Sequence, residues 1–259
     1  MRGIDISHWN QNVKYNNYDF VIIKASEGVN YKDPALDSHY DGLHGKSDGK
    51  PDSKKLYGFY HYARPDLGNT SVTEAKSFLS YTGHHAGNCI YALDWEGKAL
   101  EYNPTWALEF LNYVKSKTGS NPLLYISASQ ENTRSYKAIR KAGFPLWIAH
   151  WYVDKPSVKD WDEYTLWQYS SSPIDMNEFN GNKEDWFNLC GKKTTKPTTL
   201  EIGDKVKVKT RKDYNGVVND SWVLNYTFTV MEMKKDRVVI GTGKAITGAW
   251  NIKDLERVE

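Results

Sequence analysis

The chain of 259 residues has only two cysteines, Cys89 and Cys190, and neither belongs to a CxxC motif or a Cys/His cluster. We therefore expect no disulfide framework, no metal site and no cofactor. No run approaches 18 apolar residues, so membrane insertion is not expected. The net charge is only +2, which gives no indication of nucleic acid binding.

A signal peptide is also missing from the sequence pattern, because the first residues, MRGIDISHWN, contain no apolar core of the required length. We expect synthesis in the cytoplasm without an export signal of its own. Aromatic residues, in contrast, are abundant, with ten Trp and eighteen Tyr. Flat rings pack on the CH faces of pyranose sugars, which makes sugar binding a candidate function, although any single ring has a core position as the simpler explanation.

The composition changes at residues 191–199, GKKTTKPTT, which are rich in Lys, Thr and Pro and have no apolar period. This pattern predicts a linker between a first domain at 1–190 and a second at 200–259. From Lys192 onward, 14 Lys and Arg face 9 Asp and Glu, so the second domain is the basic part of the chain. A basic module suits an anionic surface such as a cell wall.

Short apolar runs alternate with helical stretches through the first domain. Strands are predicted at 3–7, 20–26, 56–63, 90–96, 122–127, 145–151 and 165–170. Helices are predicted after Ser71, where Ser71 and Glu74 would form a capping box, from Pro104 onward, and from 129 to 141. The alternation indicates an α/β fold, an irregular (β/α) TIM-like barrel with fewer than eight helices, because 190 residues are few for the full set.

The second domain shows a different pattern, with short alternating strands at 206–209, 227–233, 237–241 and 250–258. Turn-rich segments separate them, including GTGKAITGA at 241–249. This is typical of a small all-β barrel and resembles the bacterial Src-homology-3-like domains.

Acidic residues follow the predicted barrel strands at the ends where active sites of such barrels lie. Asp5 belongs to the first strand, Asp94 and Glu96 to the fourth, and Asp175 to the stretch after the last. Asp94 and Glu96 point to one face of their strand, with Cα atoms roughly 6–7 Å apart. Repulsion between two such carboxylates keeps one protonated, as glycoside hydrolysis requires. Taken alone, the pair also fits two solvated acids at a strand end.

A family resemblance sharpens this interpretation. GIDISHWN, FVIIKASEG, GFYHYARP, YALDWEG, LWIAHW and LWQYSSSPIDMNEFNG occur in the order and spacing of glycoside hydrolase family 25. The chain resembles that family, the muramidases of phage endolysins and Chalaropsis-type lysozymes, over residues 2 to 188. The resemblance implies a shortened barrel of eight strands with fewer helices. It also implies cleavage of the β-1,4 bond between N-acetylmuramic acid and N-acetylglucosamine.

The resemblance also implies roles for individual residues. Glu96 matches the general acid, and Asp94 matches the acid that acts as nucleophile or orients the N-acetyl group of the substrate. Asp5 and Asp175 match two further carboxylates of the cleft. Aromatic candidates for sugar contact, each equally suited to the core, are Tyr60, Tyr62, Tyr125, Trp147 and Trp167.

The expected partner is bacterial peptidoglycan, with a holin releasing the enzyme to the wall. The second domain would bind wall peptide or be a passive appendage, with Trp222, Tyr226 and Trp250 as candidate contacts or core residues. Two rival functions remain open. One is a wall amidase or endopeptidase, which would need zinc ligands or a paired Cys and His. The other is an inactive wall-binding protein. No pattern indicates an oligomeric state.

Overall fold

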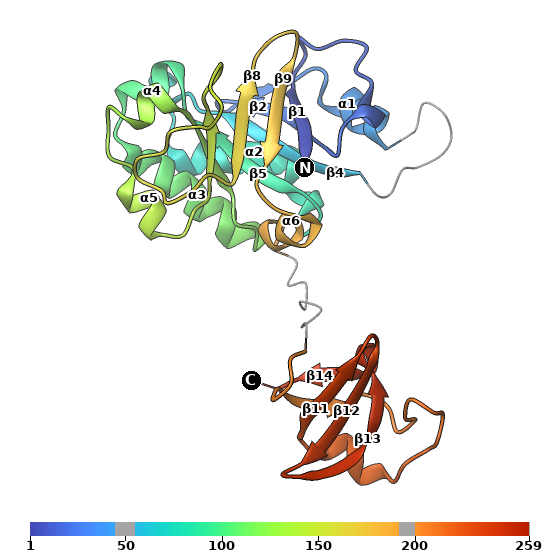
Figure 1. The fold of residues 1–259 in the computed structure, drawn as a ribbon. Coiled ribbons are helices and arrows are strands. Elements are labelled where there is room, and N and C mark those ends of the chain that lie inside the picture. The colour runs from blue at the N-terminus through green and yellow to red at the C-terminus, as the bar shows by residue number, and fades with distance from the viewer. Residues whose placement is uncertain (45–54, 192–199, 259) are drawn as a thin grey trace. The chain divides into compact units, whose positions relative to one another are not determined.

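The computed structural model describes residues 1–44, 55–191 and 200–258 (Figure 1). The chain divides into two compact units, Met1–Thr194 and Thr195–Glu259. Of the predicted linker at 191–199, only Gly191 lies within the described residues, so the linker and the domain bounds stay predictions. Within the described ranges, no helix combines the length and the apolar character that a membrane crossing demands.

Eight strands of the first unit close into a barrel. Its strands are β1 (Arg2–Ile6), β2 (Phe20–Glu27), β4 (Leu56–Tyr62), β5 (Ile90–Asp94), β6 (Leu123–Ser127), β7 (Leu146–Ala149), β8 (Leu166–Ser170) and β9 (Asp175–Phe179). They follow the order β1-β9-β8-β7-β6-β5-β4-β2, and parallel pairing of β1 with β2 closes the ring. The short β3 (Tyr31–Lys32) adds antiparallel to β2. The eight-stranded barrel with few helices is confirmed.

Strand β9 is a correction to the sequence analysis, which ended the strands at 170 and placed Asp175 after them. Asp175 is the first residue of β9, which runs antiparallel to both β1 and β8. The strand escaped detection because its fully buried residue Asn177 is polar. Asn177 donates a hydrogen bond to Asp5 inside the barrel, so the usual apolar alternation is missing.

Helices are fewer than strands. They are α1 (Leu36–Leu43), α2 (Ser71–Thr82), α3 (Pro104–Thr118), α4 (Ala128–Glu131), α5 (Lys137–Lys141) and α6 (Lys183–Leu189), with 3-10 turns at Tyr15–Asn17, Pro65–Leu67, Gly83–His85 and Gly97–Glu101. In Figure 1, α3, α4 and α5 lie along one side of the barrel and α6 lies at its end. The prediction of a single helix at 129–141 is wrong, because α4 and α5 are two short helices that residues 132–136 separate. The buried Glu131 carboxylate accepts backbone hydrogen bonds from Lys159 and Asp160, a tertiary contact at the end of α4.

Two apolar layers hold the unit together, one inside the barrel and one between the barrel and its helices. Inside, Trp186 of α6 packs against Phe20 and Phe179, with ring centroids 4.9 and 5.2 Å apart, and so closes the end where the parallel strands begin. Gly3 leaves room for this plug, because a Cβ there would lie 2.4 Å from the Phe20 ring. The apolar plug leaves polar side chains to the opposite end.

The start of α2 differs from the predicted capping box. Thr70, not Ser71, is the N-cap, and its side chain accepts from the backbone N–H of Thr73. Glu74 is fully buried, and its carboxylate accepts from His61 Nε2 at 2.9 Å, from the Arg64 backbone N–H at 3.0 Å and from Asn69. The carboxylate therefore joins α2 to β4 instead of capping its own helix.

The second unit is a five-stranded antiparallel sheet in the order β13-β12-β11-β10-β14. Its strands are β10 (Lys205–Val208), β11 (Phe228–Lys234), β12 (Arg237–Thr242), β13 (Ala245–Asn251) and β14 (Leu255–Arg257), with 3-10 turns at Ser221–Asn225 and Ile252–Asp254. The turn predicted at 241–249 is too long, because only the hairpin around Gly243, with a φ of 58°, separates β12 from β13. Small residues, with little strand propensity, concealed the start of β13.

Replacing Glu74 by Gln should destabilise the first unit by about 1–3 kcal/mol, because an amide nitrogen cannot accept the hydrogen bonds that one carboxylate oxygen now receives. Thermal unfolding of the full chain by calorimetry measures this as a lower Tm. The control is Glu101→Gln, an exposed residue paired with Lys98, where we expect a change within about 0.5 kcal/mol. Equal Tm values for both variants would contradict the role of Glu74.

Candidate active site

Four carboxylates and several aromatic rings line one cavity of about 230 Å³ in the first unit. The acidic residues are Asp5, Asp94, Glu96 and Asp175. Tyr60, Tyr125, Trp147, Trp151, Gln168 and Ser171 complete the lining. The structure thus brings together the four acidic residues that the sequence analysis singled out, from positions up to 170 residues apart in the sequence.

The barrel register explains how the acids meet. Asp5 of β1 lies directly opposite Asp175 in the antiparallel β1–β9 pairing. Asp94 is the last residue of β5, and Glu96 continues in extended backbone at φ −143°. Trp95 between them is fully buried on the other side, where it packs against Trp106. The alternation of an extended chain therefore delivers both acids to the cavity and the indole to the core.

Gly97 lets the chain turn away immediately after Glu96. Its φ is 55°, and a Cβ at this position would lie 2.4 Å from Tyr62 Oη. A side chain would therefore clash with Tyr62 and strain the backbone. Tyr62 itself sits at the edge of the site, with the Lys24 ammonium 4.9 Å from its ring centroid.

Asp5 is the most firmly held of the acids. Its Oδ2 accepts from Gln168 Nε2 at 2.9 Å and from Asn177 Nδ2 at 2.6 Å. Burial, together with the neighbouring charge of Asp175, nevertheless raises the pKa of Asp5 to about 8. Burial also raises the pKa of Asp175, to about 6. The two amides stabilise the ionised form of Asp5 but do not outweigh the loss of water.

The pKa values of Asp94 and Glu96 depend on burial and on one nearby cation, Lys24. Burial and the charge of Glu96 raise the pKa of Asp94 well above its ordinary value. Burial also raises the pKa of the half-buried Glu96, against the opposing charge of Lys24. Asp94 Oδ1 is buried and has no hydrogen-bond partner among the described residues. An acceptor or acid without a partner, facing a cavity, is available to a ligand.

The predicted aromatic residues divide into three groups. Tyr60, Tyr125 and Trp147 line the cavity, where the Trp147 indole donates to Asn177 Oδ1 at 2.8 Å. Tyr62 flanks the cavity without being among its lining residues. Trp167 does not line it: its indole donates to the His150 backbone carbonyl at 2.8 Å, and it belongs to the outer apolar layer.

Sequence reasoning missed three residues that line the cavity, Trp151, Gln168 and Ser171, and of these Gln168 makes the most hydrogen bonds within the site. Its Oε1 accepts from Tyr125 Oη and from the Trp151 indole, each at 3.1 Å, while its Nε2 donates to Asp5. One buried amide therefore orients an acid and two rings. A signal was present, because a polar residue two positions after the inward-facing Leu166 of β8 points to the same side.

Other reactive side chains serve the fold. His61 is fully buried between Ser26 Oγ at 2.8 Å and Glu74, as expected for a structural histidine. Cys89 is buried, and burial raises the pKa of its thiol. In the part of the chain that the structure describes, no group of three or more His, Cys, Asp or Glu is arranged to hold a metal ion.

Comparison with known proteins decides the family. The model of glycosyl hydrolases family 25 matches residues 4–178, which run from β1 into β9 and include all four carboxylates of the cavity. The chain belongs to glycosyl hydrolase family 25. It is therefore a glycoside hydrolase, and the acids of the cavity lie in the family 25 domain.

Individual relatives agree with this membership. Lysozyme M1 of Streptomyces globisporus is 29% identical over 215 residues, which cover 70% of this chain and 68% of that protein. The crystal structure of the lysozyme from Streptomyces coelicolor superposes with a TM-score of 0.62 and 29% identity, covering 74% of this chain and 97% of that one. The catalytic domain of the endolysin from Listeria monocytogenes bacteriophage P40 gives a TM-score of 0.53 and 28% identity, covering 74% and 97%.

Replacing Asp5 by Asn should stabilise the family 25 domain at high pH. The folded chain keeps the Asp5 proton up to a pKa of about 8, whereas the unfolded chain releases it near pH 4. Between these values the folded state binds more protons, so wild-type stability falls as pH rises. Asn cannot ionise, and we expect the Tm of the variant to exceed that of wild type by more than about 4 °C at pH 8.

The gain should shrink as pH falls and vanish below about pH 3, where Asp5 is protonated in both states. The control is Asp37→Asn, because Asp37 is exposed and paired with Lys32, and this change should give no gain that grows with pH. Parallel Tm curves for wild type and Asp5→Asn from pH 4 to pH 8 would contradict the retained proton.

Proposed function

We propose that this protein is an endolysin that cleaves the β-1,4 bond between N-acetylmuramic acid and N-acetylglucosamine, with Glu96 as the general acid. Muramidase activity on peptidoglycan follows from membership of family 25 together with the lysozymes among its relatives. The observation that carries the residue roles is the single cavity in which two acids of raised pKa, Asp94 and Glu96, stand two residues apart.

Glu96 suits the role of proton donor. It is half-buried, so it reaches both the cavity and the solvent that reloads its proton. Burial raises its pKa, which keeps the acid protonated at a higher pH than a solvated glutamate. In the proposed step, Glu96 gives its proton to the glycosidic oxygen as the bond to the anomeric carbon breaks.

Asp94 acts on the sugar whose anomeric carbon is attacked. Its partnerless Oδ1 either bonds to that carbon as a nucleophile or accepts from the N–H of the acetamido group, which then attacks through its own oxygen. Both routes need an ionised Asp94 during the reaction. The Lys24 charge opposes the rise in the pKa of Asp94 and so favours that ionised form.

Asp5 and Asp175 influence the electrostatic potential around Asp94 and Glu96. Asp5 is fixed by two amides, and Asp175 lies opposite it in the register. Asp175, ionised above its pKa of about 6, supplies negative charge that stabilises the positive charge developing on the sugar ring in an oxocarbenium-like transition state. Tyr60, Tyr125 and Trp147 would hold the sugar through their faces and polar tips.

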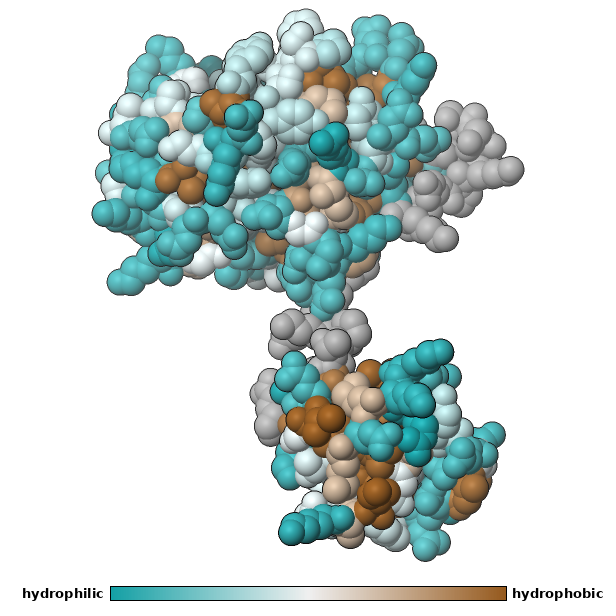
Figure 2. Space-filling view, in the orientation of Figure 1, coloured by the Kyte–Doolittle hydropathy of each residue, from teal (hydrophilic) through white to brown (hydrophobic). Residues whose placement is uncertain are grey.

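The second unit is proposed to be a Src-homology-3-like domain that holds the enzyme on the wall. Figure 2 shows apolar surface gathered on the visible face of this unit. Its exposed apolar residues include Ile202, Val217, Val218, Trp222, Tyr226 and Ile246. Trp222 and Tyr226 are about half exposed and pack edge to face at 5.9 Å, next to the buried Phe228. We infer that the exposed pair of Trp222 and Tyr226 contributes to a binding surface, whereas Trp250 is fully buried in the core. Synthesis in the host cytoplasm with release by a holin completes the endolysin proposal.

Replacing Glu96 by Gln should lower the rate of wall cleavage by about 10²-fold or more, because the amide cannot transfer a proton. The measurement is release of new reducing ends from purified Gram-positive walls, followed together with turbidity. Glu101→Gln, an exposed residue in the next turn, is the matched control and should keep full activity.

Three outcomes separate the proposal from its rivals. Reducing ends from wild type but not from Glu96→Gln, with walls still bound, support it. Clearing of walls without new reducing ends would mean that an amide bond is cut, as in the amidase or endopeptidase alternative. Full activity of Glu96→Gln would move the acid role to another carboxylate of the cavity.

Replacing Trp222 by Ala should weaken sedimentation of the full chain with walls about tenfold, because exposed aromatic anchors contribute most to such contacts. Cleavage of short soluble glycan fragments should not change, since these fragments need only the first unit. Tyr214→Ala is the control, since Tyr214 is exposed to a similar degree but bonds to Asp236 within its own unit. Unchanged sedimentation of Trp222→Ala would count against this patch.

A further inference from the structure

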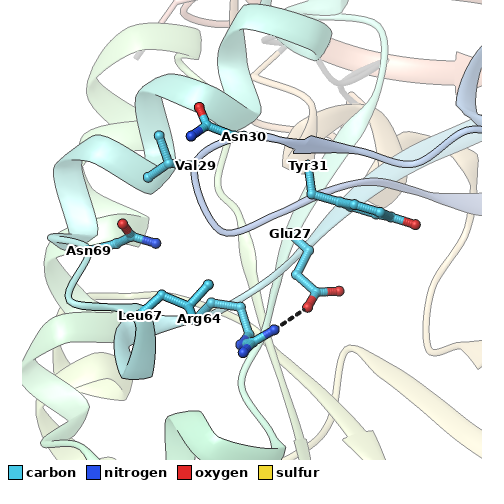
Figure 3. Close-up of a pocket in the computed structure, with 7 residues that line it drawn as sticks. All are labelled: Glu27, Val29, Asn30, Tyr31, Arg64, Leu67 and Asn69. Atoms are coloured by element: carbon cyan, nitrogen blue, oxygen red, sulfur yellow. Dashed lines mark hydrogen bonds and ion pairs between the residues drawn. The ribbon is translucent and has the colours of Figure 1, made fainter.

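A second hollow lies beside the carboxylate cavity and has no part in the chemistry described above. It encloses about 590 Å³ and is lined by Glu27, Val29, Asn30, Tyr31, Arg64, Leu67 and Asn69. Figure 3 shows these side chains around the hollow, with the Arg64 guanidinium joined to the Glu27 carboxylate. The size falls within the range of small-ligand sites.

The hollow lies on the same rim of the barrel as the four acids. Glu27 is the last residue of β2, and Arg64 follows the end of β4, so both stand at the carboxyl ends of parallel strands. Lys24 links the two places. Its ammonium lies 2.9 Å from Glu27 Oε2, 4.9 Å from the Tyr62 ring centroid and 5.8 Å from that of Tyr31.

Charges at the hollow are already paired. Arg64 donates from Nε and Nη2 to the two oxygens of Asp66, both at 2.9 Å, and from Nη1 to Glu27 at 2.6 Å. Glu27 also accepts from Lys24. A charged ligand finds no unpaired partner among these residues, whereas hydroxyl groups can use the remaining lone pairs of the carboxylates.

Apolar surface completes the lining. Tyr31 is 38% exposed and Leu67 is 59% exposed, so a ring face and a branched side chain meet solvent beside the polar groups. Gly28, with a φ of 56°, lies next to this lining, since the place of a Cβ there is 3.5–3.6 Å from side-chain atoms of Arg64, Asn69 and Leu67. The paired Glu27 carboxylate and Arg64 guanidinium lie beside the exposed Tyr31 ring. This combination suits a pyranose, which presents hydroxyl groups at its edge and CH groups on its face.

We propose that this hollow binds an N-acetylated sugar of the same glycan strand whose bond lies over the carboxylates. The strand would run from the cavity across Lys24 and Tyr62, with the CH face of the distal sugar on Tyr31 and its acetamido methyl near Leu67. This inference rests on the proposed muramidase function. It adds a determinant of substrate length to it.

The test uses glycan fragments of increasing length, each prepared with and without its stem peptides, as substrates for the full chain. Tyr31→Ala should lower kcat/KM about tenfold on long fragments and leave the shortest cleaved fragment unaffected, because only long strands reach the hollow. Leu67→Ala should show the same dependence on length. Tyr102→Ala is the matched control, because Tyr102 has the same exposed fraction of 38% but lines neither hollow.

Each other outcome has a distinct meaning. An equal loss at every length would overturn the inference, because Tyr31 would then act on the carboxylates and not on a distal sugar. No loss at any length would overturn it as well. A loss confined to fragments that still carry stem peptides would place peptide, not sugar, in the hollow. Absence of new reducing ends with wild type would instead refute the muramidase function itself.

Discussion

The first unit depends on a compromise between burial and repulsion at one end of its barrel. Four carboxylates share a cavity, and burial raises the pKa of each of them. Donated hydrogen bonds from Gln168 and Asn177 and the positive charge of Lys24 oppose that rise without cancelling it. The site therefore holds protons near neutral pH, which is the property that general acid catalysis needs and that costs the fold stability.

The rest of the barrel is arranged to sustain this compromise. Apolar residues and the Trp186 plug fill the end where the parallel strands begin, so the polar groups concentrate at the other. The antiparallel β9 is part of the same arrangement, because it places Asp175 opposite Asp5 and turns Asn177 inward. The buried carboxylate of Glu74 anchors α2 and the segment after β4, which carries Arg64 beside the second hollow.

Both hollows lie on the same rim, yet they handle charge in opposite ways. Around Asp5 and Asp94, like charges are crowded together and one oxygen, Asp94 Oδ1, has no hydrogen-bond partner within the described residues. Around Glu27 and Arg64, each charge meets its opposite within hydrogen-bond distance. The first arrangement keeps carboxyl groups protonated and available for reaction, whereas the second offers a fixed polar surface suited to binding. A polymer such as a glycan strand can occupy both hollows at once, with bond cleavage at the carboxylates and binding of a distal sugar beside Glu27 and Arg64.

The sequence by itself determined the alternation of strands and helices, the two-part organisation as a prediction, and the acids Asp5, Asp94, Glu96 and Asp175 as members of one rim. These follow from local patterns, because strand period and strand ends are visible in short segments. Only the tertiary structure decided that 171–179 contains an eighth, antiparallel strand. It also decided that the Glu74 carboxylate binds His61 instead of capping α2. The same holds for Gln168, which binds Asp5 in the site, and for Trp167, which packs in the outer apolar layer. Each of these rests on a partner distant in sequence, and a polar residue shows its role only when that partner is known.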